Sequence, residues 1–361
     1  MGRFYGPESR LLVTGGGTGG HVIPALEIAR AHRRRKSSPV FYAGGPGSLE
    51  SRLSEASQIP FFPVSSGGVV GKSFTEKLEG LRKMAAGIPA ALSILARVRP
   101  DLVIGTGGYV QIPVVVAARL KRIPIVLLEP NRIPGLANRL LGPLAARTVF
   151  PGKDSTGMGG IPVGEGVRGP EPVRERFSRT PSRILVMGGS QGARSLNRLM
   201  PEILGGLRNS AVWPIEILHQ SGERWMEETR ELYRSLGVPA RVEGFLPGIS
   251  GLLRDQTLVI ARAGAMTIAE LTGSGTPAIY IPFPHSAGRH QEENALSIER
   301  QGGGWYWSED SLMEPEARIR ELSEILGRPE TLFSVARTAW HISPAVSSDE
   351  WLLALEKSTL P

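Results

Sequence analysis

The chain has 361 residues, which suggests two domains at about 100–200 residues per domain. Hydrophobic residues make up 41% and charged residues 21%, so the chain can bury a substantial core. It has no cysteine, which excludes disulfides, thiolate metal sites and a cysteine nucleophile. Its net charge of +8 favours anionic partners such as nucleotides and lipid phosphates, and no apolar run is long enough to predict a membrane-spanning segment.

The first half of the chain alternates short apolar runs with helical patterns. Residues 11–14 predict a buried strand, which a run of glycines and a helix over residues 25–35 follow. Further strands are expected at residues 40–43, 101–105, 125–129 and 148–151, each near a helix or a glycine-rich turn. This alternation predicts a parallel sheet that is covered on both faces.

The pattern loosens over residues 152–179, which are rich in glycine, proline and charge, and then restarts. Strands are predicted at residues 183–187, 215–219, 258–261 and 278–281. We therefore predict an α/β fold of two doubly wound, Rossmann-like domains, residues 1–163 and 164–341, which face an inter-domain cleft. Residues 342–361 contain a terminal helix over 349–357, which packs either on the second domain or back on the first.

Three glycine-rich loops follow predicted strands. Their sequences are GGGTGGH at residues 15–21, GTGGY at 105–109 and GGSQGAR at 188–194. Glycine permits a positive φ and a close backbone approach, and a helix N-terminus offers unpaired N–H groups to an anion. One such loop is weak evidence, but three in two repeated units predict phosphate sites on both domains. The first loop departs from the dinucleotide fingerprint, and no acidic residue closes the second predicted strand at the usual distance.

Three side chains are placed for chemistry. His21 ends the first loop at a helix start, where it could act as a general base or donate to a phosphate; a helix-capping histidine is the structural alternative. Glu129 follows an apolar strand and could take a proton from an acceptor hydroxyl, orient His21, or simply form a turn. The residues alone do not decide whether His21 or Glu129 is the general base. Glu270 lies about one helical turn beyond residues 264–266 and could bind ribose hydroxyls, or be an exposed glutamate.

These motifs, together with EPN at 129–131, HQSG at 219–222 and the stretch 264–270, occur in the order found in the MurG family of glycosyltransferase family 28. The resemblance covers about residues 10–305. It implies a GT-B fold and an inverting transfer of N-acetylglucosamine from UDP-N-acetylglucosamine (UDP-GlcNAc) to the C4 hydroxyl of lipid I, the undecaprenyl-pyrophosphoryl muramyl pentapeptide. The product would be lipid II, made for peptidoglycan by a peripheral enzyme at the cytoplasmic face of the cell membrane.

The resemblance also implies roles for single residues, with His21 and Glu129 as the catalytic pair. The acceptor would be held by Gly16, Gly17, Thr18, His21, Gly107, Gly108 and Tyr109. In the first domain, the donor would be held by Thr18, Gly19, Gly20 and Asn131. In the second domain, Gly189 and Ser190 would contact the phosphates, and Phe245 and Leu246 the uracil. Ala265, Met266, Thr267 and Glu270 would lie at the ribose and phosphates, and His290 and Gln291 at the sugar.

Four positions depart from the family's pattern. The family often has His and Gln where this chain has Leu128 and Pro130, and a serine where it has Ala263. An arginine expected at the donor phosphates is replaced by Gly164, and Arg168 is one candidate substitute. We expect activity to survive with altered donor contacts. The sequence contains no metal-cage motif, so we expect no tightly bound cofactor and a divalent cation only as a stimulant.

A lipid-linked acceptor requires contact with a membrane surface. Phe74, Leu78, Leu81, Ala85 and Ile88 repeat at helical spacing, and Lys72, Lys77, Arg82 and Lys83 surround them. A basic amphipathic helix suits an anionic interface, although a core-facing helix with solvated charges has the same pattern.

Two other classes of protein remain as alternatives. A UDP-GlcNAc 2-epimerase of the two-domain type, or a dehydrogenase, could share the fold. A basic nucleic-acid-binding module is disfavoured because the positive charge is scattered and no aromatic-interleaved RNA motif occurs.

Overall fold

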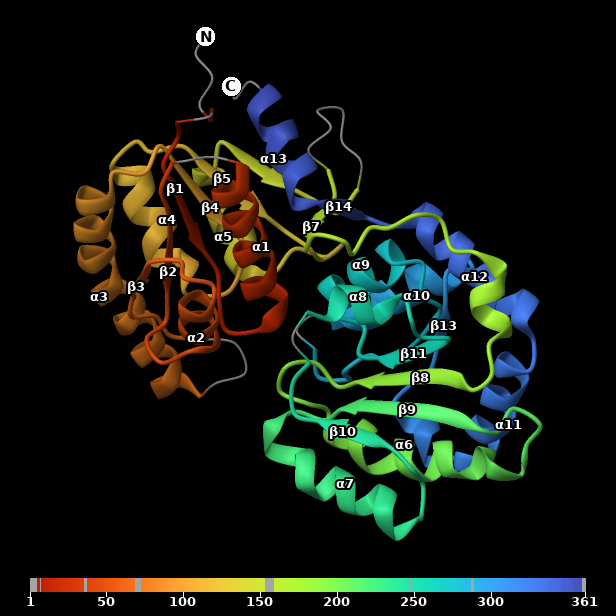
Figure 1. The fold of residues 1–361 in the computed structure, drawn as a ribbon. Helices are drawn as coiled ribbons and strands as arrows, with labels where there is room; N and C mark the ends of the chain where they lie inside the picture. Colours follow the sequence, from red (N-terminus) through yellow and green to blue (C-terminus); the bar gives the residue numbers. More distant parts are fainter. Residues whose placement is uncertain are drawn as a thin grey trace. The chain divides into compact units, whose positions relative to one another are not determined.

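The computed structural model describes residues 5–6, 8–35, 38–68, 73–152, 159–246, 248–286 and 289–358. The chain forms two compact units, which are drawn in Figure 1. Unit 1 comprises Met1–Gly164 and Val346–Pro361, and unit 2 comprises Glu165–Ala345. Each unit contains one six-stranded sheet whose neighbouring strands run parallel, so the predicted doubly wound α/β class is confirmed.

The sheet of unit 1 has the order β3-β2-β1-β4-β5-β6. Its strands are β1 Leu11–Thr14, β2 Val40–Gly44, β3 Phe61–Pro63, β4 Leu102–Gly105, β5 Ile125–Leu128 and β6 Arg147–Val149. The chain order reverses between β1 and β4, and ligands of such sheets bind outside the carboxyl ends of the strands at this point. The first two glycine loops leave β1 and β4, so both lie at the reversal.

Helices cover both faces of this sheet because its strands are apolar on both sides. Leu11 and Val13 pack with α1 and α13, whereas Leu12 packs with α3 and α4. The helices of unit 1 are α1 Gly19–Arg35, α2 Leu49–Ala56, α3 Phe74–Val98, α4 Gln111–Leu120, α5 Leu136–Leu141 and α13 Ser348–Lys357.

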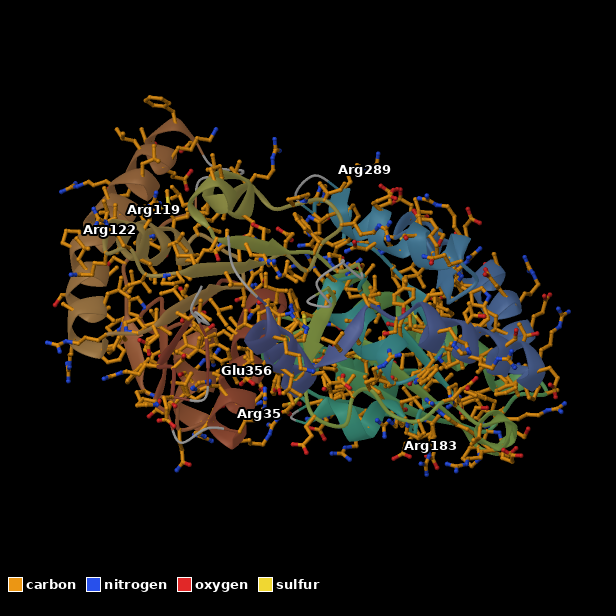
Figure 2. The ribbon with its side chains drawn as sticks, turned by 90° about the horizontal axis from the view of Figure 1, so that it is seen from above. Arg35, Arg119, Arg122, Arg183, Arg289 and Glu356 are labelled. Carbon is orange, nitrogen blue, oxygen red and sulfur yellow. The ribbon has the colours of Figure 1, made fainter. Side chains whose placement is uncertain are left out.

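The C-terminal helix α13 packs on α1, although more than 300 residues separate them (Figure 1). Its Trp351 joins the core of unit 1. Arg34 pairs with Asp349 at 2.7 Å, and Figure 2 shows Arg35 pointing toward Glu356, whose carboxylate lies 3.4 Å away. The basic end of α1 is therefore neutralised in part by α13.

We expect Trp351→Ala to destabilise unit 1 by about 3–5 kcal/mol, because the cavity would replace a large buried side chain. Trp351 is 1% exposed, whereas Leu353 on the same helix is 41% exposed. Leu353→Ala is the matched control and should change the free energy of unfolding by less than about 0.5 kcal/mol. Urea unfolding of the two variants measures the difference, and equal losses would mean that α13 is not anchored through Trp351.

The sheet of unit 2 repeats the pattern of unit 1 with the order β10-β9-β8-β11-β12-β13. Its strands are β8 Ser182–Met187, β9 Ile215–Gln220, β10 Arg241–Glu243, β11 Leu258–Ala261, β12 Ala278–Tyr280 and β13 Trp305–Tyr306. Its helices are α6 Arg194–Gly206, α7 Met226–Ser235, α8 Ile249–Leu253, α9 Ala265–Gly273, α10 His290–Arg300, α11 Pro315–Leu326 and α12 Pro329–Ile342. A separate two-stranded sheet pairs β7 Ile161–Val163 with β14 Ala345–Ser347.

Candidate active site

The first glycine loop joins β1 to α1 and brings His21 to the edge of the sheet. Gly17 has a φ of +86°, a conformation that favours glycine. A Cβ on Gly15 would lie 2.0 Å from Thr106 Oγ1, which donates to the backbone oxygen of His21 at 2.7 Å. The loop is thus held close to the end of β4, and the first N–H groups of α1 lack intrahelical acceptors.

A hydrogen bond to the backbone fixes the tautomer of His21. Its Nδ1 lies 3.1 Å from the carbonyl oxygen of Gly16 and 3.4 Å from Thr18 Oγ1. Because a carbonyl oxygen can only accept, Nδ1 carries the proton, and in the neutral ring Nε2 is the nitrogen with the lone pair. Nε2 is therefore the atom of His21 that can accept a proton.

The second glycine loop, after β4, packs directly on the first. The N–H of Gly16 donates to the carbonyl of Gly107 at 3.2 Å. Gly107 has a φ of +115°, and a Cβ there would lie 2.4 Å from Cδ2 of His21. A Cβ on Gly108 would lie 2.2 Å from the carbonyl oxygen of Gly16. The structure thus brings the predicted residues Gly16, Thr18, His21, Gly107 and Gly108 together.

Glu129 organises the loop that follows β5. It is 2% exposed, and its carboxylate accepts four hydrogen bonds. Oε1 accepts from the N–H and the side-chain Nδ2 of Asn131, both at 3.0 Å, and Oε2 accepts from the N–H of Gly135 at 2.8 Å and Asn138 Nδ2 at 3.0 Å. These bonds fill the acceptor positions of the carboxylate and fix Asn131.

The third glycine loop, after β8, begins unit 2 in the same manner. Gly189 and Gly192 have φ values of +84° and +74°, and a Cβ on Gly192 would lie 1.8 Å from the carbonyl oxygen of Ser221. Ser190 lies half-buried in the turn before α6. The loop is therefore packed against the turn that follows β9.

A series of buried hydrogen bonds stabilises the turn after β9, against which the third glycine loop packs. Asn197 Nδ2 donates to the carbonyl of Ser221 at 2.9 Å, and Asn197 Oδ1 lies 3.0 Å from Nε2 of His219. Since the amide oxygen only accepts, Nε2 of His219 is protonated and its Nδ1 accepts from Tyr233 Oη at 3.0 Å. Burial lowers the pKa of His219 to about 3, so the ring is neutral at physiological pH.

The stability of the chain should depend on pH through His219. Its folded pKa lies below the unfolded value of about 6.5, so the unfolded state binds more protons between these values. Stability is therefore lost as the pH falls from about 6.5 toward about 3, by up to about 1.4 kcal/mol per pH unit. Chemical denaturation of wild type and His219→Gln over this range tests the point. Parallel losses in the two proteins would show that another group titrates.

The other predicted donor residues of unit 2 lie after β10, β11 and β12. Phe245 is 36% exposed, and Leu246 packs on the core below it. Ala265, Met266 and Thr267 form the first turn of α9; Glu270 follows in that helix, and Met266 is buried. His290 begins α10, and Gln291 Oε1 accepts from the N–H of Phe283 at 2.9 Å.

Arg168, the candidate substitute for the missing arginine, makes contacts within unit 2. The Arg168 guanidinium lies 5.0 Å from the ring centre of Trp340 and 3.4 Å from the carbonyl oxygen of Ala345. Arg262, after β11, donates to Ser195 Oγ at 2.9 Å and to the carbonyl of Pro282 at 2.9 Å, and it pairs with Glu309. Both cations therefore hold loops of unit 2 together.

The predicted apolar stripe on α3 is exposed. Phe74, Leu78 and Leu81 are 82%, 61% and 56% exposed, Ala85 is exposed, and Ile88 is half-buried. A different line of residues faces the core: Gly80, Met84, Gly87, Ala91, Leu95 and Val98. The core-facing alternative is therefore wrong for the first part of this stripe. Lys72 lies outside the described residues.

Sequence reasoning missed several polar residues that support the loops. Thr106, Gln111, Asn138 and Asn197 are all buried and hydrogen-bonded at the ends of β4, β5 and β9. The sequence feature that could have identified these residues is a polar side chain beside a glycine loop or near the start of a helix. Among the described residues, no group of three or more His, Asp or Glu could hold a metal ion, and no helix has the length and apolar character needed to cross a membrane.

Known proteins resemble this chain over most of its length. The profile of the glycosyltransferase family 28 N-terminal domain matches residues 11–150, and that of the family's C-terminal domain matches residues 183–348. A relative from Acidovorax ebreus (strain TPSY) is 40% identical over 82% of this chain and 75% of its own length. Another, from Methylococcus capsulatus, is 37% identical over 91% of this chain and 93% of its own. Both are named UDP-N-acetylglucosamine--N-acetylmuramyl-(pentapeptide) pyrophosphoryl-undecaprenol N-acetylglucosamine transferase.

Solved structures give the same answer for the fold. The crystal structure of Acinetobacter baumannii MurG has a TM-score of 0.76 and 27% identity, over 97% of this chain and 100% of that one. A putative UDP-N-acetylglucosamine 2-epimerase from Listeria monocytogenes has a TM-score of 0.64 over 97% of this chain and 96% of its own, but at 14% identity it shares the fold alone. The predicted GT-B class and the predicted resemblance are thus confirmed, and the chain belongs to glycosyltransferase family 28, in the MurG group of N-acetylglucosaminyltransferases.

Proposed function

We propose that this enzyme moves N-acetylglucosamine from UDP-GlcNAc to lipid I and forms lipid II for peptidoglycan. The identity of 40% to a transferase named for this reaction, over 82% of the chain, carries the proposal. The three glycine loops support it, because each leads from a strand into a helix start, whose N–H groups would bind a phosphate. The loop after β8 would hold the donor diphosphate, and the loops after β1 and β4 the acceptor.

His21 is the general base in this proposal. Its Nδ1 proton is committed to Gly16, so Nε2 can take the proton of the acceptor's C4 hydroxyl. The hydroxyl oxygen bonds to the anomeric carbon of the donor sugar as the bond from that carbon to the diphosphate oxygen breaks, and UDP leaves. Glu129 would act through Asn131, whose backbone N–H and side-chain amide it holds by hydrogen bonds, and Asn131 would contact the transferred sugar.

The donor site would use the residues placed around the ends of β8, β10, β11 and β12. Phe245 and Leu246 would contact the uracil, Glu270 the ribose, and His290 and Gln291 the sugar. Gly189, Ser190 and the first turn of α9 would hold the diphosphate, where the helix dipole stabilises negative charge. No tightly bound cofactor is part of the proposal, and a divalent cation would only stimulate.

The enzyme would bind peripherally at the cytoplasmic face of the membrane, and the exposed stripe on α3 supports its contact with an anionic membrane surface. Lys77, Arg82 and Lys83 are exposed on the same helix. Helix α4 packs against α3, and Figure 2 shows Arg119 and Arg122 beside that helix. Each basic residue near an anionic surface contributes about 1 kcal/mol, and each fully buried Phe or Leu about 1.5–3 kcal/mol.

Replacing Phe74, Leu78 and Leu81 with serine should lower binding to anionic vesicles by about tenfold or more, since three apolar contacts with the lipid would be lost. Val173, Leu236 and Met313 are also exposed apolar residues but lie on unit 2, and their triple serine variant is the matched control. Vesicle sedimentation measures both variants. Equal binding by the two would place the membrane contact elsewhere.

The transfer itself is tested with labelled UDP-GlcNAc and a short-chain lipid I analogue. Label should move to the lipid only when both substrates are present. Conversion of the labelled UDP-GlcNAc to its 2-epimer, with the sugar still attached to UDP and without any need for acceptor, would instead favour the epimerase alternative.

A further inference from the structure

A chain of buried amide groups joins two of the loops in unit 1. The N–H of Gly107 donates to Gln111 Oε1 at 3.0 Å, and Gln111 Nε2 donates to Asn138 Oδ1 at 2.6 Å. Asn138 Nδ2 then donates to the carbonyl of Leu128 and to Glu129 Oε2, both at 3.0 Å. Gln111 is fully buried and Asn138 is 5% exposed, so water does not compete for these bonds.

The direction of every bond in this chain is determined. A backbone N–H can only donate, so Gln111 must turn its oxygen toward Gly107 and its nitrogen toward Asn138. Asn138 must in turn present its oxygen to Gln111 and its nitrogen to Leu128 and Glu129. Rotating either amide by half a turn would set donor against donor or acceptor against acceptor in a buried site.

Each end of the chain meets a residue of the proposed active site. Gly107 packs directly against the imidazole ring of His21, since a Cβ on Gly107 would lie 2.4 Å from Cδ2 and 2.8 Å from Nε2 of that ring. Glu129, at the other end, holds both the N–H and the side chain of Asn131. The proposed base and the proposed sugar contact thus depend on one set of hydrogen bonds.

We propose that Gln111 is a positioning residue that sets where the His21 ring lies relative to Asn131. The inference rests on the proposed function, because it assigns His21 and Asn131 their roles. Gln111 never touches substrate in this account; it fixes Gly107, and Gly107 fixes the imidazole. Displacement of a reacting group by about 1 Å can lower a rate about a hundredfold, so such a residue affects turnover more than substrate binding.

The site accepts glutamine for reasons of length and polarity. A Cβ on Gly105 would lie 2.5 Å from Gln111 Oε1, so a glycine at position 105 makes room for the Gln111 amide. Asparagine would be one methylene too short to span Gly107 and Asn138. Methionine keeps the length and volume but offers neither bond. Glutamate keeps the length, and its neutral form offers both an acceptor and a donor.

The test compares wild type, Gln111→Met, Gln111→Glu and the control Ser54→Ala. Ser54 is also buried in unit 1, and its Oγ makes a bond of 2.9 Å to the carbonyl of Ile59, away from the loops. The readouts are kcat at saturating substrates, the Kd for UDP, and the NMR signals of the His21 ring, one of six histidines in the chain.

We expect Gln111→Met to lower kcat by about 10- to 100-fold, to leave the Kd for UDP within about twofold, and to shift the His21 signals. Ser54→Ala should change none of the three. The ratio of kcat for Gln111→Glu to that of wild type should rise as the pH is lowered, because protonation restores the missing donor.

Two results would overturn the proposal: unchanged His21 signals in Gln111→Met, or a Gln111→Glu ratio that is flat with pH and as low as that of Gln111→Met. If wild type shows no transfer at all, the proposed function fails instead. The His21 signals of the four proteins still decide whether Gln111 sets the ring.

Discussion

Replacing His21 with alanine is expected to lower kcat by about a hundredfold or more, the usual effect of removing a general base. The reason is geometric, since Nδ1 donates to Gly16 and leaves Nε2 to accept the proton. His21 is only half-buried, so its loss should leave the free energy of unfolding nearly unchanged. Steady-state kinetics and urea unfolding of the same preparation separate these two effects.

Glu129→Gln supplies the contrasting variant. In Glu129→Gln, an NH2 group would replace one carboxylate oxygen and would face groups that also donate. These groups are the N–H and Nδ2 of Asn131 on one side, or the N–H of Gly135 and Nδ2 of Asn138 on the other. We therefore expect it to lose stability together with activity, whereas His21→Ala loses activity alone. Losses in kcat of less than about tenfold in both His21→Ala and Glu129→Ala would remove both residues from catalysis.

A large loss of stability is expected from Arg176→Met in unit 2. The Arg176 guanidinium is buried and donates to the carbonyls of Gln256, Gly275 and Leu253 and to Thr276 Oγ1, at 2.8–3.2 Å. Burial lowers its pKa to about 10, so it remains charged at neutral pH. Methionine would remove all of these bonds. The carbonyl of Leu253 would keep the N–H of Gln256 and Thr276 Oγ1 as donors, and Thr276 Oγ1 would keep Ser274 as a partner. The carbonyls of Gln256 and Gly275 would lose their side-chain donor at about 1–3 kcal/mol each, offset in part by removal of a desolvated charge.

We expect a net loss of about 3–5 kcal/mol for Arg176→Met, a large share of the roughly 5–15 kcal/mol that stabilises a typical domain. The matched control is Arg174→Met two residues earlier, where the arginine is 60% exposed and pairs with Glu330 on the surface. That change should cost less than about 1 kcal/mol. Similar midpoints of urea unfolding for the two variants would contradict the assignment.

The sequence was sufficient for the main strands and for the repeat. The strands that carry the glycine loops are uniformly apolar, and that pattern is a local property of the chain. The strands β3, β10 and β13 escaped prediction because they are only two or three residues long, and β3 and β10 also end in Pro63 and Glu243, which strands disfavour. Their pairing depends on neighbouring strands, which no short window of sequence records.

In the candidate site, too, local sequence predicts some features and the fold determines others. The loops were recognisable because glycine is required locally, as the φ of Gly107 shows. The role of Glu129 was not, because its partners Asn131, Gly135 and Asn138 are assembled by the fold of the loop after β5. Gln111 was missed for the same reason, since an isolated glutamine at a helix start has no distinctive pattern.

The most direct test of the central claim is the structure of the reaction product. The enzyme is incubated with UDP-GlcNAc and a lipid I analogue, and the lipid product is analysed by NMR. The account predicts UDP and a disaccharide in which the new sugar is attached in the β configuration to the C4 oxygen of the muramyl residue. An α linkage, a different hydroxyl, or conversion of UDP-GlcNAc to a 2-epimer without transfer would contradict it.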